Sequence, residues 1–500
     1  MTIVETRSGK VLGLELEGVH VFRGIPYAAP PVGERRWQPP IAEQPWAGVR
    51  DATEFGPQSA QSEFALTKML GAAQPPCSED SLYLNVWTPG CDDARRPVMV
   101  WIHGGAFLWG AGDTPWYDGT RFASNDVVLV TINYRLGPFG FLYLGDLLGE
   151  RFAGSGNLGL LDQIAALEWV RDCVDAFGGD PNRVTIFGES AGGASVATLL
   201  GAPAARGLFR GAIPQSGAAS WTTTRDQATA VAQGVLDRVG VAAGDVSGAL
   251  AVPTDALIGA LPSFREDTVN TLPFQPVVDG VVLPQPPLAT IAAGNAAGVH
   301  VLAGTNRHEM TLFMLADPAF GRLTDDLVRE RVRRVAGHDG DQSDAVVRGY
   351  RERRPEASPQ DLWLDLATDS VFRIPALRLL EAQHPHAPVW SYLFTWETPV
   401  FGGLLRSTHA LEIPFVFDNL TRGRAEILTG TGGERAGLAR AMHRAWTAFA
   451  RSGDPNHDGL PAWPRYDLNR RPTMRFDAAP EVLDDPAGDD RRQMEAALGV

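Results

Sequence analysis

The most regular pattern in the chain is a series of short, continuously apolar runs separated by longer amphipathic stretches. The apolar runs lie at residues 98–102, 127–132, 184–187, 299–302 and 389–396. Continuous apolar character over four to eight residues is typical of strands that are covered on both faces, as in parallel sheets. Between two of them, residues 160–177 have apolar positions at helical spacing and end at Gly178 and Gly179. This alternation predicts an α/β fold with a mostly parallel central sheet flanked by helices.

The alternation loosens between residues 222 and 372. This stretch contains polar helical segments, such as 325–335, and charged runs at 329–334 and 348–354 that are typical of solvated helix faces. We therefore expect one domain over residues 1–500, with an inserted cap-like helical region at about 222–372. A late amphipathic helix is predicted over 434–451, because Gly453 and Pro455 follow it.

Charge and composition narrow the possible partners. The 500 residues have a formal net charge of −15, which argues against nucleic acid and against anionic lipid as partners. Three cysteines without a CxxC spacing make a disulfide framework or a zinc site improbable. The first ten residues are polar and no apolar run approaches ~20 residues, so we expect no signal peptide, no membrane span and a cytoplasmic protein. For the assembly we expect a monomer or a small homo-oligomer.

The sharpest local motif is G-x-S-x-G at residues 188–192. It directly follows the apolar run 184–187, and small residues after Ser190 begin a plausible helix. A nucleophilic serine needs a tight strand-to-helix turn that raises its hydroxyl above the sheet, and glycines on both sides allow the backbones to approach closely. The five-residue pattern alone is weak, but its context predicts that Ser190 is a catalytic nucleophile.

A second glycine-rich element follows the run 98–102. His103, Gly104 and Gly105 form an HGG sequence, which in serine hydrolases lies beside the nucleophile and supplies backbone N–H groups to a developing oxyanion. We assign the oxyanion donors as the N–H groups of Gly105, Ala106 and Ala191.

The base and its orienting acid are less sharply defined by pattern. Serine hydrolases of this type order the triad as Ser, then Asp or Glu, then His along the chain. His409 follows the run 389–396, where a late histidine loop is expected, and Glu309 follows the run 299–302. Seven other histidines also follow Ser190, and acidic loop residues are common, so the pattern favours His409 and Glu309 without excluding the alternatives.

Several ordered motifs show a resemblance that extends over nearly the whole chain. Among them are RGIPYAAPPVG at 23–33, SEDSLYLN at 78–85, NYRLGPFG at 133–140, FGGDP at 177–181 and FARSGDPN at 449–456. Together with the serine and histidine segments, they make the chain resemble the type-B carboxylesterase family, which includes bacterial para-nitrobenzyl esterases, animal carboxylesterases and cholinesterases. The resemblance implies an α/β-hydrolase fold with inserted helices.

The resemblance also assigns residues. It places Glu309 and His409 at the family's acid and base positions. It implies two buried ion pairs, Arg36 with Glu79 and Arg135 with Asp162. The sequence departs from the family at Ser81, where relatives often have a cysteine, and this departure agrees with a reducing compartment.

These assignments lead to an expected function. Ser190 would attack a small or medium apolar ester, His409 would transfer the protons and Glu309 would orient His409, with no metal or other cofactor. A His409 pKa near ~6–7 is expected if the group is unperturbed. The candidate residues for the pocket wall, all of which could equally be core residues, are Phe107, Leu108, Trp221, Phe274 and Phe313. Two alternatives to a carboxylesterase remain. One is a hydrolase of the same fold that acts on carbamates, amides or specialised natural-product esters, and the other is a non-catalytic binding protein.

Overall fold

The computed structural model describes residues 1–63, 75–261, 272–314, 317–336 and 340–498. Among these residues, thirteen strands form one sheet, and twelve of them follow one another across it. Their order across the sheet is β1 (Thr2–Thr6), β2 (Gly9–Leu16), β3 (Val19–Pro26), β7 (Tyr83–Thr88), β9 (Val128–Ile132), β8 (Arg96–Ile102), β10 (Gly179–Glu189), β11 (Gly211–Gln215), β14 (His300–Asn306), β15 (Val389–Phe394), β16 (Pro472–Phe476) and β17 (Glu481–Asp484), and β4 (Val49–Asp51) pairs with β2.

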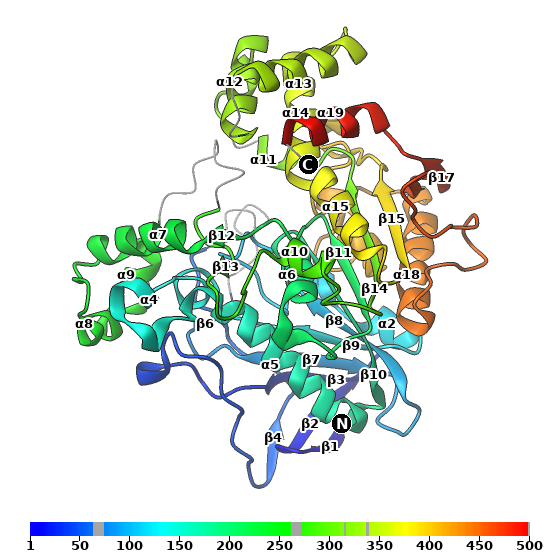
Figure 1. The fold of residues 1–500 in the computed structure, drawn as a ribbon. Coiled ribbons are helices and arrows are strands. Elements are labelled where there is room, and N and C mark those ends of the chain that lie inside the picture. Colours follow the sequence, from blue (N-terminus) through cyan, green and yellow to red (C-terminus); the bar gives the residue numbers. More distant parts are fainter. Residues whose placement is uncertain (64–74, 262–271, 315–316, 337–339, 499–500) are drawn as a thin grey trace.

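The centre of the sheet is parallel. The seven strands from β9 to β16 pair in parallel, whereas β1, β2, β3 and β7 at one end and β17 at the other pair antiparallel. The mostly parallel α/β sheet that the sequence predicted is therefore confirmed. Because parallel strands need long crossover connections, helices cover both faces of this part of the sheet (Figure 1).

The continuous apolar character of the central strands follows from this double cover. In β8, Val98 and Val100 contribute to one hydrophobic core, and Met99 and Trp101 contribute to another. Helices α5 (Leu158–Cys173) and α6 (Ala191–Gly201) contribute to the first core, and α18 (Glu434–Ser452) contributes to the second. Successive residues of a strand point to opposite faces, so a strand between two cores needs an apolar residue at every position.

A helical lobe stands above the sheet in the orientation of Figure 1. It contains α12 (Asp325–Ala336), α13 (Gly340–Arg353), α14 (Pro359–Thr368) and the C-terminal α19 (Gly488–Leu498), and these helices share a third hydrophobic core. A separate helical group, α7 (Arg225–Arg238), α8 (Val246–Ala251) and α9 (Thr254–Gly259), lies to the left in the same view. The expected cap region at 222–372 thus contains the sheet strand β14, which divides its helices into two insertions.

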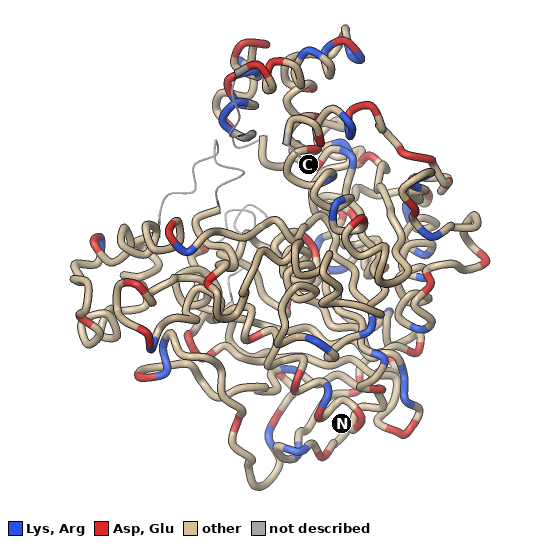
Figure 2. Tube along the Cα trace, in the orientation of Figure 1, with Lys and Arg blue, Asp and Glu red and all other residues tan. Residues whose placement is uncertain are grey.

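Both predicted ion pairs are confirmed. Arg36 donates through Nε to Glu79 at 2.8 Å, and Arg135 donates through Nε and Nη2 to the two oxygens of Asp162 at 2.8 and 2.7 Å. Elsewhere, positively and negatively charged positions are intermingled on the outer elements, including the helical lobe and the N-terminal strands (Figure 2).

The described residues contain the three cysteines Cys77, Cys91 and Cys173, and of these Cys91 and Cys173 are free thiols. Within the same residues there is no cluster of three or more side chains that could hold a metal ion. None of the described helices is both long and apolar enough to cross a bilayer.

Candidate active site

Ser190 occupies a sharp turn between β10 and α6. Its backbone angles are φ 58° and ψ −123°, and it is the N-cap residue of α6. A non-glycine residue with positive φ stores strain of roughly 1–3 kcal/mol, which the surrounding structure must impose. The turn leaves Ser190 half-buried, whereas the neighbouring Glu189 and Ala191 are buried. The side chain that the motif predicts as nucleophile is thus the accessible one at this corner.

Glycines allow the backbone to pack tightly around this turn. A Cβ atom on Gly188 would lie 2.5 Å from the carbonyl oxygen of Ile102, and one on Gly192 would lie 2.0 Å from the same atom. A Cβ atom on Gly217, which follows β11, would lie 2.4 Å from the carbonyl oxygen of Ser190. Since real Cβ atoms essentially never approach other atoms so closely, both glycines of the motif are sterically required.

The HGG loop lies against the turn. A Cβ atom on Gly104 would lie 3.1 Å from the Cβ of Ser190 and 2.6 Å from the carbonyl oxygen of Glu189. The loop has an irregular backbone, with positive φ at Gly105, Ala106 and Phe107. The hydroxyl of Tyr134 donates to the carbonyl of His103 at 2.8 Å, which ties this loop to the chain after β9.

The N–H groups of this corner are available to a ligand. In the part of the chain that the structure describes, the N–H groups of Gly105 and Ala106 donate to no other residue, and Ala191 begins α6, where helix N–H groups have no intrahelical partner. The positive end of the α6 dipole adds to the attraction for a negative oxygen. The three predicted donors therefore have no competing acceptor among the described residues.

His409 and Glu309 form a buried pair. Nδ1 of His409 lies 2.7 Å from Oε2 of Glu309, and the other carboxylate oxygen accepts the N–H of Asn306 at 2.7 Å. Glu309 follows β14 and His409 follows β15, two adjacent parallel strands in which Asn306 is in register with Phe394. The carboxyl ends of neighbouring strands bring two residues separated by a hundred positions into hydrogen-bonding distance.

A second carboxylate faces the other ring nitrogen of His409. Nε2 lies 3.1 Å from Oε1 of Glu189, and both side chains are 5% exposed. Burial alone lowers the pKa of His409, but the charges of Glu189 and Glu309 outweigh it and raise this pKa to about 9. The expectation of ~6–7 applied to an unperturbed histidine, and the neighbouring Glu189 and Glu309 remove that condition. For Glu189, by contrast, burial is the main cause of a raised pKa, which is about 8.

Glu412 completes the acidic layer behind the imidazole. It accepts hydrogen bonds from Gln215 at 3.1 Å and from the side-chain amide of Asn306 at 2.7 Å. The amide of Asn306 also donates to the carbonyl of Thr408, next to His409. These contacts fix the loops of Glu309 and His409 relative to each other.

Aromatic rings cover His409. The rings of Phe313 and Phe372 lie 5.1 and 5.0 Å from the imidazole, and Trp221 packs edge-on against Phe372 at 5.4 Å. Of the five candidate wall residues, Phe313 thus contacts the histidine directly, and Trp221 packs behind Phe372. Phe107, Leu108 and Phe274 are buried in the first hydrophobic core, which agrees with the alternative interpretation of those three as core residues.

Three residues of this site were missing from the sequence-based set. Glu189, Glu412 and Phe372 all lie within the cluster around His409. Glu189 is the variable residue inside the G-x-S-x-G motif, so its place beside the nucleophile was visible in the sequence, but its contact with the histidine was not. Of the other histidines, His443 is buried in α18 beside Phe122 and His300 binds the carbonyl of Gly453.

The mostly parallel sheet, the strained serine at the strand-to-helix turn and the histidine–carboxylate pair on the following strands define an α/β-hydrolase. The carboxylesterase family model matches residues 1–495, and the chain belongs to this family. It is therefore an ester hydrolase.

The comparisons with individual proteins agree with this assignment. The chain is 40% identical to the para-nitrobenzyl esterase of Bacillus subtilis, with 99% of each chain covered, and 36% identical to the phenmedipham hydrolase of Pseudarthrobacter oxydans, with 93% and 92% covered. A crystal structure of a Geobacillus stearothermophilus carboxylesterase superimposes with a TM-score of 0.90 at 45% identity, covering 99% of this chain and all of that one.

Proposed function

We propose that the protein hydrolyses small and medium apolar carboxylic esters through an acyl-enzyme formed on Ser190. The observation that supports this most directly is the 2.7 Å contact between His409 and Glu309 beside the strained turn of Ser190. His409 takes the proton of the Ser190 hydroxyl as the oxygen attacks the ester carbonyl, and it then gives the proton to the leaving alcohol. Water repeats both steps and releases the acid.

The oxyanion of each tetrahedral intermediate is stabilised by the N–H groups of Gly105, Ala106 and Ala191. Removing one donor of this kind typically lowers kcat by about 10²–10³-fold, because the donors are already in position before the charge develops. Glu309 holds the imidazole in the tautomer that presents Nε2 to the serine. In the described part of the chain the hydroxyl of Ser190 makes no hydrogen bond to Nε2, and such contacts are commonly long in an enzyme without its substrate.

The apolar rings of Trp221, Phe313 and Phe372 favour apolar groups next to the reacting bond. The relative named para-nitrobenzyl esterase supports aromatic esters as substrates to test. Hydrolysis of carbamates or amides at the same site would use the same residues, so rates on a matched ester, carbamate and amide separate these substrate classes.

The decisive experiment compares the wild type with Ser190→Ala on p-nitrophenyl acetate, p-nitrophenyl butyrate and a p-nitrobenzyl ester. We expect the variant to lose at least ~10³-fold in kcat/KM on every ester. Ser216→Ala is the matched control, since Ser216 is a fully buried serine at the end of the adjacent β11 and is expected to leave turnover intact. Equal rates for the wild type and Ser190→Ala would exclude the mechanism.

A further inference from the structure

An irregular helical turn carries one of the rings that pack against His409. The helical run from α14 to α15 (Ile374–Gln383) is interrupted by the π-helical turn η8 (Asp369–Arg373). At this turn the N–H of Ile374 donates to the carbonyl of Asp369, five residues earlier instead of four. Single π turns of this kind are rare and are found frequently at functional sites.

The sequence explains why the helix changes here. In a regular α-helix the carbonyl of Val371 would accept the N–H of residue 375. Residue 375 is a proline, which has no N–H and whose ring clashes with the carbonyl four residues earlier. The π turn widens the helix just before Pro375, and the Val371 carbonyl cannot receive the α-helical bond from residue 375.

That carbonyl is used by a residue of the site. The indole Nε1 of Trp221 donates to the carbonyl oxygen of Val371 at 3.3 Å. The ring of the next residue, Phe372, packs against both Trp221 and His409. The Val371 carbonyl therefore binds Trp221, and the neighbouring ring of Phe372 links that indole to the imidazole of His409.

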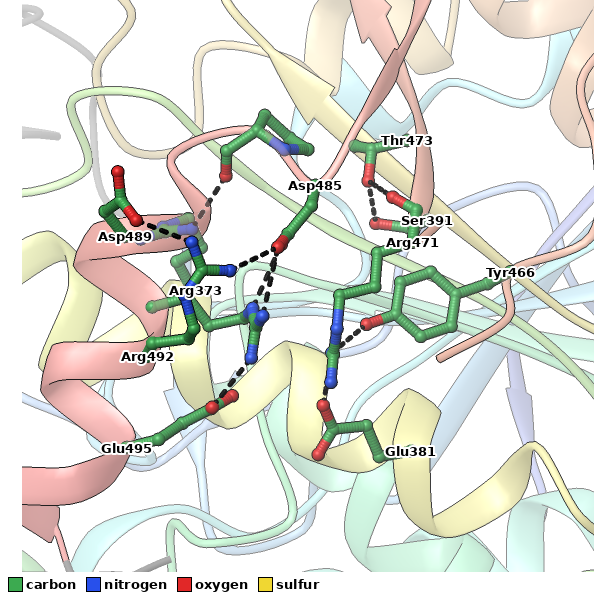
Figure 3. A network of polar contacts seen from close by, with 12 residues as sticks. Arg373, Glu381, Ser391, Tyr466, Arg471, Thr473, Asp485, Asp489, Arg492 and Glu495 are labelled. Carbon is green, nitrogen blue, oxygen red and sulfur yellow. Dashed lines mark hydrogen bonds and ion pairs between the residues drawn. The ribbon is translucent and has the colours of Figure 1, made fainter. Parts of the chain in front are cut away.

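The outer side of the π turn is held by a buried ion pair. Arg373 donates through Nη2 to Asp369 at 2.8 Å and through Nη1 to the carbonyl of Pro486 at 3.1 Å, and the hydroxyl of Tyr350 donates to the same aspartate. Figure 3 shows Arg373 beneath the C-terminal segment that contains Asp485. The side chains of Asp369 and Arg373 are only 9% and 11% exposed, so this contact fixes the turn from the side of the lobe and the C-terminus.

We infer that Pro375 is a positioning residue for the active site: by forcing the π turn, it places Phe372 against His409 and Trp221 against Phe372, and so determines which ester groups the site accepts. Pro375 itself acts only through the turn and the two rings. The inference rests on the proposed function, because it assigns the rings to the wall of the substrate site.

The test is Pro375→Ala in the full chain. Alanine restores the N–H, so the α-helical bond to the Val371 carbonyl can form in place of the bond from Trp221, and Phe372 moves away from His409. We expect the ratio of kcat/KM for p-nitrophenyl butyrate to that for the acetate to change by at least about tenfold. Thermal stability should be unchanged or higher, because proline is the least favourable residue inside a helix.

Pro359→Ala is the matched control. Pro359 is the first residue of α14 in the same helical run, where a missing N–H costs nothing, so its replacement should leave the ratio at the wild-type value. Trp221→Phe is a second test, which keeps a ring but removes the donor to Val371 and should also shift the ratio.

The outcomes separate the inference from the proposed function. A Pro375→Ala ratio within about twofold of the wild type overturns the inference, and so does an equal loss on both esters with a lower Tm, which would indicate general damage to packing. If Pro375→Ala does not fold, an unchanged ratio in Trp221→Phe overturns it. Titration of the active site with a phosphorylating ester tests Ser190 independently, because it fails in the wild type only if the proposed function is wrong.

Discussion

Nε2 of His409 lies 3.1 Å from a carboxylate oxygen of Glu189, the residue that immediately precedes the serine. The imidazole is thus held between two glutamates, with Glu309 on its other nitrogen at 2.7 Å. A protonated imidazole is attracted to both carboxylates at once, whereas a general base must be neutral. The arrangement therefore stabilises the form of His409 that cannot accept the serine proton.

The first prediction concerns pH. Both carboxylates, when ionised, favour the protonated form of His409 and raise its pKa to about 9, so kcat/KM should rise with pH through the alkaline range. Glu189→Gln removes one of the two charges and should move the acidic limb of the profile down by about one unit or more. The measurement is kcat/KM for p-nitrophenyl acetate between pH 5.5 and 10.

Ser190→Ala provides the blank for this profile, because it reports the spontaneous hydrolysis of the ester at each pH. Superimposable profiles for the wild type and Glu189→Gln would show that Glu189 does not set the pKa of the base.

The second prediction concerns Gly104. A Cβ atom there would press on the carbonyl of Glu189 and on the Cβ of Ser190, so Gly104→Ala should push the HGG loop away from the serine. We expect kcat to fall by about 10²-fold or more, the typical result of removing an oxyanion donor, with a smaller effect on KM.

Gly437→Ala is the control for this loss. Gly437 lies inside α18 with open space around it, so the alanine should stabilise the protein by about 0.5–1 kcal/mol and leave kcat unchanged. A Gly104→Ala variant with wild-type kcat would contradict the placement of the loop.

The third prediction concerns the buried pair of Arg135 and Asp162, whose side chains are 3% and 0% exposed. Asp162→Asn leaves a buried guanidinium without its counter-charge and should destabilise the fold by about 3–5 kcal/mol in chemical denaturation. In the exposed pair of Arg171 and Asp172, Asp172→Asn should cost less than about 1 kcal/mol. Similar losses in the two variants would contradict this difference in burial.

Much of the fold could be predicted because local patterns matched the final environment. The runs 98–102 and 127–132 became β8 and β9 almost to the residue, since a strand between two cores must be apolar throughout. The prediction for 299–302 was too short, because β14 continues through Thr305 and Asn306, polar residues that an apolar pattern cannot include. The range 222–372 was interpreted as one insertion because β14, with seven residues, is short compared with the long helices before and after it.

The sequence indicated candidate site residues where a reaction requires a fixed residue type, and it gave no indication of residues that belong to the cluster only because they lie close to it. The G-x-S-x-G motif fixed Ser190, and the resemblance selected Glu309 and His409 from many candidates. Phe372 lies in a helix whose register changes at Pro375, so no periodicity of 3.6 residues places its ring at the histidine. The contact of Glu189 with His409 joins residues 220 positions apart in the chain, and no local pattern reports such a distance.

The strand β14 has a consequence for how this scaffold can change. It bears the loop of Glu309 at its end and pairs with β11 on one side and β15 on the other, while separate helical insertions precede and follow it. Helices can be lengthened, shortened or replaced in either insertion without altering the order of the strands. The two helical insertions around the proposed substrate site can therefore vary independently of each other. The spacing of Glu309 and His409 stays fixed, because the strands that precede them, β14 and β15, are hydrogen-bonded neighbours.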